Sequence, residues 1–124
     1  MSLLFTLLGL AKALDIQSIP SSGPPPSSRQ YSVMSHSKDL NHLVVFGGNQ
    51  GVSVTYQDLW KFEIESSSWV KLDSNNSPPQ ARYSSGSFFK ESTSEFCVFG
   101  GISLRGPLQD IWCFDETTLK VGFI

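Results

Sequence analysis

The most constraining feature of the sequence is an internal repeat with a period of just over 50 residues. The first copy reads HLVVFGG and then QDLWKF, and the second reads EFCVFGG and then QDIWCF. Gly47 and Gly100 lie 53 positions apart, and Trp60 and Trp112 lie 52 apart. A chain with such a repeat is built from supersecondary units that bury their apolar faces against one another. We therefore expect a modular fold with one unit per copy.

Each copy reads as short strands separated by turn signals. Apolar residues fill every position from Leu43 to Phe46, which is typical of a strand covered on both faces. Residues 65–68 form a turn whose hydroxyl groups can bond their own backbone. Outside the apolar N-terminus, no stretch shows sustained helical periodicity with caps. The expected strands are residues 31–36, 42–46, 58–64 and 69–72 in the first copy, and 83–89, 95–99, 110–115 and 119–123 in the second.

The glycines and aromatic residues of the repeat have a physical role in such a sheet. Paired glycines allow positive φ and let a neighbouring backbone approach where a Cβ would clash. Trp60 and Phe62 are two positions apart, so they share one face of their strand, and Leu59 and Lys61 share the other. The aromatic rings supply the apolar area that a thin sheet needs for its core.

The pattern runs from a proline and an arginine, through an apolar strand that ends in two glycines, to an aromatic pair and then a tryptophan. This pattern resembles the kelch repeat over residues 25–115. The resemblance implies an all-β fold: two four-stranded antiparallel kelch-type blades of a β-propeller, in an incomplete ring. The structural motif residues are Arg29, Gly47, Gly48, Trp60 and Trp69 in the first copy, and Arg82, Gly100, Gly101 and Trp112 in the second.

Two departures from the family pattern are present. The family often has histidine three residues after the arginine, where this chain has Ser32 and Ser85. The second copy has Val121 where the first has Trp69, so its last strand is expected to be degenerate or truncated. We interpret the repeated arginine as structural, bonding carbonyl groups between strands.

The repeats divide the chain into four segments. Residues 29–77 form the first repeat and residues 78–124 the second, and residues 14–28 are a Pro/Ser-rich linker with an extended backbone. Residues 1–13 have two interpretations: a signal peptide cut after an A-x-A motif, or the worn last strand of a preceding repeat. The first predicts a secreted or secretory-pathway protein and the second a cytoplasmic one. The apolar run is too short to span a bilayer, so no transmembrane span is expected.

The number of repeats constrains assembly. Propellers close a ring of roughly four to eight blades, and repeat architectures generally need about three units to be stable. Two blades leave two apolar faces without a neighbour. We therefore expect either a fragment of a longer propeller or self-association, or a partner, that completes the ring.

Few residues suggest chemistry. We predict no catalytic, cofactor-binding or metal-binding residues, because His36 and His42 lack further ligands at metal-site spacing. Cys97 and Cys113 lie in strands expected to be adjacent, which allows a disulfide in a secreted chain, although we favour free buried thiols. Asn75 begins a glycosylation sequon, used only if the chain is secreted. The net charge of −2 and scattered basic residues indicate no nucleic-acid binding.

The favoured hypothesis is a non-enzymatic protein–protein interaction module, because the usual ligands of kelch propellers are other proteins. The candidate partner-binding loops are residues 49–57 and 102–109, with Asn49, Gln50, Tyr56 and Arg105 as contact residues. The alternative is part of a propeller-based oxidase or sugar-processing enzyme, for which the chain offers no Cys-Tyr-His ligand set. A third hypothesis is a truncated product without an independent role.

Overall fold

The computed structural model describes residues 16–37, 39, 41–73, 78–118 and 120–123. This part of the chain contains two four-stranded antiparallel sheets. The first sheet has the order β1-β2-β5-β6 and consists of β1 (Val33–His36), β2 (His42–Phe46), β5 (Leu59–Glu63) and β6 (Ser68–Leu72). The second has the order β7-β8-β11-β12 and consists of β7 (Gly86–Lys90), β8 (Glu95–Phe99), β11 (Ile111–Asp115) and β12 (Lys120–Phe123).

These sheets confirm the all-β fold of two four-stranded units. The described residues contain no helix, and hence none that could cross a membrane. The strand β12 forms although Val121 replaces the expected tryptophan, so the second sheet has its fourth strand. The first strand of each sheet begins later than predicted. Tyr31 and Ser84 adopt φ values of 54° and 53°, which breaks the extended conformation just before β1 and β7.

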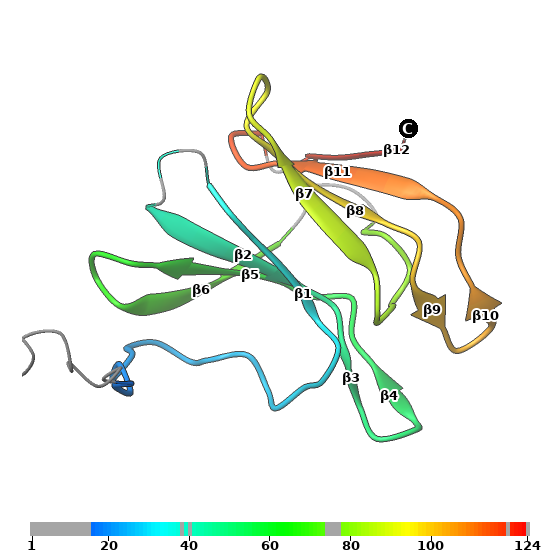
Figure 1. Ribbon diagram of the computed structural model, residues 1–124, viewed down its shortest axis with the longest axis horizontal. Coiled ribbons are helices and arrows are strands. Elements are labelled where there is room, and N and C mark those ends of the chain that lie inside the picture. Colours follow the sequence, from blue (N-terminus) through cyan, green and yellow to red (C-terminus); the bar gives the residue numbers. More distant parts are fainter. Residues whose placement is uncertain (1–15, 38, 40, 74–77, 119, 124) are drawn as a thin grey trace, which may run out of the picture.

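Two small hairpins were not predicted. The strands β3 (Asn49–Gln50) and β4 (Val54–Thr55) form one, and β9 (Ile102–Ser103) and β10 (Gly106–Pro107) form the other. Each lies in a segment that the sequence indicated only as a loop. Figure 1 shows both hairpins projecting at the same end of the molecule, next to the inner strands β1 and β7.

The two sheets stack face to face and share one apolar core. The core residues are Val44, Phe46 and Leu59 from the first sheet and Phe96, Val98 and Phe114 from the second. Trp60 and Phe62 share one face of the first sheet, as predicted from their spacing. That face is the one opposite to the shared core. Their counterparts Trp112 and Phe114 point toward the first sheet, because both sheets stack in the same orientation.

The cysteines differ from the favoured prediction. Cys97 on β8 lies directly opposite Cys113 on β11, with Cα atoms 4.0 Å apart, and the two form a disulfide. Both residues are buried. The interpretation that these thiols stay free is wrong in this structure. Opposed positions on neighbouring antiparallel strands bring the side chains within bonding reach.

The described part of the linker also pairs with a strand of the first sheet. The Ser22 N–H donates to the Ser67 carbonyl (2.9 Å), and the Trp69 N–H donates to the Ser22 carbonyl (3.0 Å), so the linker pairs with β6 in parallel. A Cβ on Gly23 would lie 2.8 Å from the Trp69 oxygen. The Trp69 ring packs on Phe62, with centroids 4.9 Å apart. The 1–13 segment and Asn75 lie outside the described residues.

Candidate functional site

An arginine, an aspartate and a tryptophan form a bonded unit at the end of the first sheet. The Arg29 guanidinium donates to both carboxylate oxygens of Asp58, at 2.6 and 2.9 Å. The Trp60 indole N–H donates to the same carboxylate at 2.7 Å. Arg29 Nη1 also donates to the Gly47 carbonyl at 3.0 Å. The arginine therefore ties the lead-in segment to the glycine turn and to β5.

The second sheet repeats this unit. Arg82 donates to both oxygens of Asp110, Trp112 donates to Asp110 at 2.6 Å, and Arg82 Nη1 donates to the Gly100 carbonyl at 3.0 Å. The Arg82 side chain is fully buried. The predicted carbonyl-bonding role of the arginines is confirmed. The aspartates were missed as their partners, although an aspartate two residues before the tryptophan recurs in both copies.

The two aspartates are held ionised by these bonds. At Asp110 the hydrogen bond from Arg82 is the largest influence, and it lowers the pKa from 3.8 to about 2 against the opposing effect of burial. At Asp58 burial alone would raise the pKa, but the hydrogen bonds from Arg29 and Trp60 outweigh it and hold the pKa below its ordinary value. The units are therefore ion pairs at neutral pH.

The diglycine turns allow the two sheets to approach. Gly47 has a φ of 67°, and a Cβ there would collide with the Arg82 carbonyl oxygen of the second sheet. Gly48 has a φ of 98°, and its N–H donates to the same oxygen at 2.9 Å. Only glycine combines this conformation with such close contact. The diglycine is thus a structural element of the junction between the sheets.

The two hairpins β3–β4 and β9–β10, which we call the hairpin face, carry exposed apolar side chains. Val52 at the first tip is 98% exposed, and Leu104 at the second is 69% exposed. Tyr31 is 63% exposed, and its ring lies beside that of Tyr83, with centroids 6.3 Å apart. Singly exposed apolar residues are common on protein surfaces, but Val52 and Leu104 lie at the tips of two hairpins that project at the same end of the molecule (Figure 1).

Of the four predicted contact residues, three make bonds within the chain. The Tyr56 hydroxyl donates to Gln50 Oε1 at 3.1 Å, and the Arg29 guanidinium lies 4.2 Å above the Tyr56 ring centroid. The Asn49 amide donates to the Gly51 carbonyl at 3.0 Å. Arg105 is exposed beside Leu104, and its side chain has no bonding partner among the residues the structure describes.

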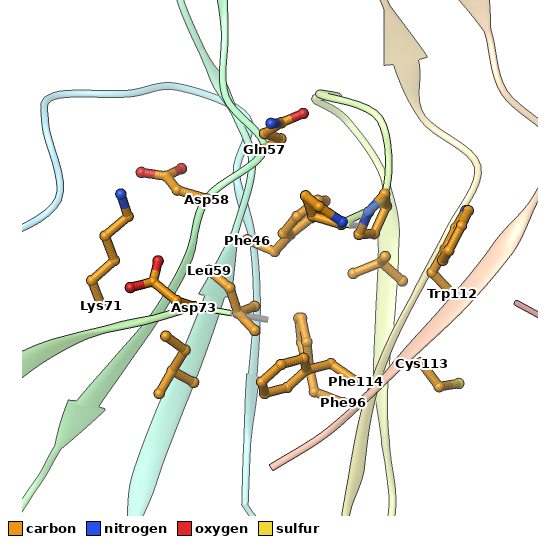
Figure 2. A pocket seen from close by; sticks show the side chains of 14 residues that line it. Phe46, Gln57, Asp58, Leu59, Lys71, Asp73, Phe96, Trp112, Cys113 and Phe114 are labelled. Carbon is orange, nitrogen blue, oxygen red and sulfur yellow. The ribbon is translucent and has the colours of Figure 1, made fainter. Parts of the chain in front are cut away.

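A cavity of about 180 Å³ lies at the junction between the sheets. Figure 2 shows Phe46, Phe96 and Phe114 gathered in it, with Asp58, Lys71 and Asp73 on the side of the first sheet. Sites for drug-sized ligands usually enclose roughly 300–1,000 Å³. The cavity is smaller than this range, so we treat it as a packing feature of the junction.

A hydrogen-bonded contact between a histidine and a carboxylate joins the sheets at the end opposite the hairpins. His42 Nε2 lies 2.8 Å from both carboxylate oxygens of Glu116, in the turn between β11 and β12. Both side chains are largely buried, and His42 lies at the start of β2. Within the described ranges, no three His, Cys, Asp or Glu side chains cluster as metal ligands would.

One comparison with known proteins decides the family. The family model of the KLHDC2/KLHL20/DRC7 Kelch-repeats domain matches residues 6–122. The chain belongs to the Kelch-repeat family. Its two sheets are kelch blades, and the bonds among arginine, aspartate and tryptophan described above recur in both. The kelch match begins at residue 6, inside the segment with two interpretations. Kelch-repeat domains typically act as protein-interaction modules.

Proposed function

We propose that the chain is a non-enzymatic kelch module that binds a partner protein through its hairpin face, as part of a larger propeller. The observation that carries this proposal is the projection of both hairpins from the same end, each with an exposed apolar tip, Val52 and Leu104. A surface held by a rigid scaffold is a usual place for recognition. Arg105 adds a cation next to Leu104.

This composition suggests the chemistry of the partner. The exposed apolar tips and the exposed ring of Tyr31 suit an extended segment with apolar side chains. The exposed guanidinium of Arg105 suits a carboxylate on the same segment, since arginine binds carboxylates in a two-pronged geometry. We therefore propose an acidic, partly apolar peptide segment as the ligand of the hairpin face.

Selection from a phage-displayed library of random linear peptides tests the proposal. We expect enriched peptides to combine acidic and apolar residues. In fluorescence anisotropy they should bind the double variant Leu104→Ser/Arg105→Ser at least about tenfold more weakly than the wild type, which corresponds to about 1.4 kcal/mol. The matched control is Val70→Ser/Lys71→Ser, which removes an exposed apolar residue and an adjacent cation from β6.

Three results would contradict the proposal. Peptides that bind the hairpin variant as tightly as the wild type would place recognition elsewhere on the chain. A selection that enriches no peptide dependent on the folded chain would argue against linear-peptide recognition altogether. An equal loss of binding in the β6 control would also count against the hairpin face.

A further inference from the structure

Among the described residues, three backbone hydrogen bonds join the first sheet and its hairpin to the segment that leads into the second sheet. The Gly48 N–H donates to the Arg82 carbonyl at 2.9 Å, and the Arg82 N–H donates to the Tyr56 carbonyl at 3.1 Å. The Ser84 N–H donates to the Tyr31 carbonyl at 2.9 Å. The lead-in segment of the second sheet is thus held by groups next to the diglycine and β4 of the first.

The equivalent groups on the free side of the second sheet are open. By the repeat, Gly101 corresponds to Gly48, Leu108 to Tyr56, and Ser84 to Tyr31. The Gly101 N–H and the carbonyls of Leu108 and Ser84 have no hydrogen-bond partner among the described residues. The second sheet therefore presents the same two acceptors and one donor that hold Arg82 and Ser84 in place.

The outer side of the first sheet carries backbone groups that could pair with these three groups of the second sheet. Arg29 corresponds to Arg82, and Tyr31 corresponds to Ser84. Within the described part of the chain, the backbone N–H and carbonyl of Arg29 and the N–H of Tyr31 are likewise unbonded. The one donor and two acceptors on the second sheet thus match one acceptor and two donors on the first.

An apolar surface accompanies the open groups of the second sheet. Phe46 of the first sheet is 4% exposed because the second sheet covers it, whereas its counterpart Phe99 is 47% exposed. Phe88 on the same face is 41% exposed, and Ile111 replaces the buried Leu59. This face of the second sheet is therefore apolar, like the face of the first sheet that the second sheet covers. Among the described residues, no sheet covers it.

The outer face of the first sheet, which points away from the second sheet, is equivalent to the face with which the second sheet covers the first. The second sheet covers the first with Val98, Trp112 and Phe114, whose equivalents are Val45, Trp60 and Phe62. Val45 and Trp60 are only 8% exposed. Most of the newly buried area in such a contact would therefore come from Phe88 and Phe99.

We propose that a second copy of this chain docks the outer side of its first sheet on the free face of the second sheet, repeating the junction found within one chain. The contact uses a different surface from the hairpin face, so it does not depend on the proposed peptide ligand. A head-to-tail contact of this kind is heterologous and can close into a ring. Rings of roughly four to eight blades correspond to two to four copies of a two-sheet chain.

One feature of the internal junction does not repeat. The positions equivalent to His42 and Glu116 are Glu95 of one copy and Ile64 of the next, so this hydrogen-bonded contact has no counterpart between copies. Glu95 is instead bonded to Lys90 and Thr93 of its own sheet. The contact between copies is therefore weaker than the junction within a chain, and assembly should depend on concentration.

Light scattering coupled to size-exclusion chromatography tests the assembly. We expect wild-type protein at about 100 µM to have a mass of two to four copies of 13.7 kDa, falling on dilution. Phe99→Glu should elute as a monomer, because a carboxylate cannot be buried in the contact without a partner. Val52→Glu, on the hairpin face, is the matched control and should assemble like the wild type. Circular dichroism checks that each variant is folded.

Cross-linking tests the register. Within the chain the Ser87 hydroxyl donates to the Met34 carbonyl at 3.2 Å, and the repeat places Ser87 of one copy beside Met34 of the next. A short bismaleimide should join a Met34→Cys chain to a Ser87→Cys chain when the two are mixed. Each variant alone should give no dimer, because each copy carries one introduced thiol and the identical positions of two neighbouring copies lie two sheets apart.

The outcomes separate this proposal from the peptide-binding one. A wild-type monomer at 100 µM, or assembly that persists in Phe99→Glu, overturns the docking of a second copy. Cross-linked dimers of equal yield from the single variants overturn the head-to-tail register. Peptide binding to the hairpin face is measured on the Phe99→Glu monomer, so its failure is seen independently.

Discussion

Asp110 shows how much of the junction depends on single side chains. Its carboxylate receives two bonds from a guanidinium with no exposed side-chain area and one from the Trp112 indole. Because its folded pKa of about 2 lies below the ordinary 3.8, its stabilising contribution is fully present above about pH 4. It is lost as the pH falls toward 2, when the carboxylate takes up a proton.

We expect Asp110→Asn to lower the free energy of unfolding at pH 7 by about 3 kcal/mol, since it leaves the buried Arg82 charge without a partner. The variant should also lose less stability than the wild type between pH 4 and pH 2. Urea unfolding at several pH values measures both effects. The control Glu91→Gln, at an exposed turn position, should change stability by under about 0.5 kcal/mol. A variant with the same acid dependence as the wild type would contradict the role assigned to Asp110.

Two glycines with similar conformations allow a second comparison. Gly47 and Gly51 have φ values of 67° and 63°, but only Gly47 has a backbone atom where a Cβ would stand. Gly51→Ala should cost about 1 kcal/mol, the strain of a left-handed alanine. Gly47→Ala should cost at least about 3 kcal/mol, because the Arg82 segment must also move. Thermal unfolding of the pair measures the difference, and equal losses would show that close approach is not what requires Gly47.

At the residue scale, the sequence predicted the bonds of Arg29 to a carbonyl but not to Asp58. The two residues are 29 positions apart, and their meeting depends on how the strands pair. The recurrence of an aspartate two residues before each tryptophan was the available signal. An aspartate before a strand is equally typical of a turn, so the signal does not identify a partner.

At the scale of the strands, the residue pattern predicted β2 and β8 with their observed bounds. Most residues of both apolar runs are buried whichever face they point to, although Phe99 at the end of β8 is half exposed. The two hairpins were missed, because strands of two residues have no periodicity to read. The late starts of β1 and β7 were missed as well, since tyrosine and serine rarely adopt positive φ.

The disulfide between β8 and β11 gives a prediction at this scale. It closes a loop of 16 residues, for which the loss of chain entropy in the unfolded state corresponds to about 3 kcal/mol. We expect dithiothreitol to lower the urea midpoint of the wild type accordingly. The double variant Cys97→Ala/Cys113→Ala should have that lower stability with or without reductant. A wild type insensitive to reductant would show that the bond does not stabilise the fold in solution.

For the whole molecule, the repeat was sufficient to predict two stacked sheets, because each copy needs a neighbour to cover its apolar face. The repeat could not show which side of each sheet the chain itself covers. That depends on the way the second sheet follows the first, which buries Phe46 and leaves Phe99 half exposed. Substitutions at these two equivalent phenylalanines therefore measure how much stability a neighbouring sheet contributes.

We expect Phe46→Ala to cost about 3–5 kcal/mol at any protein concentration, since it opens a cavity in the shared core. Phe99→Ala should cost under about 1 kcal/mol in dilute solution, where no sheet covers it, and more at 100 µM, where a second copy would. Urea unfolding followed by tryptophan fluorescence reports both sheets, because Trp60 and Trp112 lie in different ones. If Phe99→Ala were as costly as Phe46→Ala in dilute monomer, the free face would be covered within the chain, and no second copy would be needed to bury it.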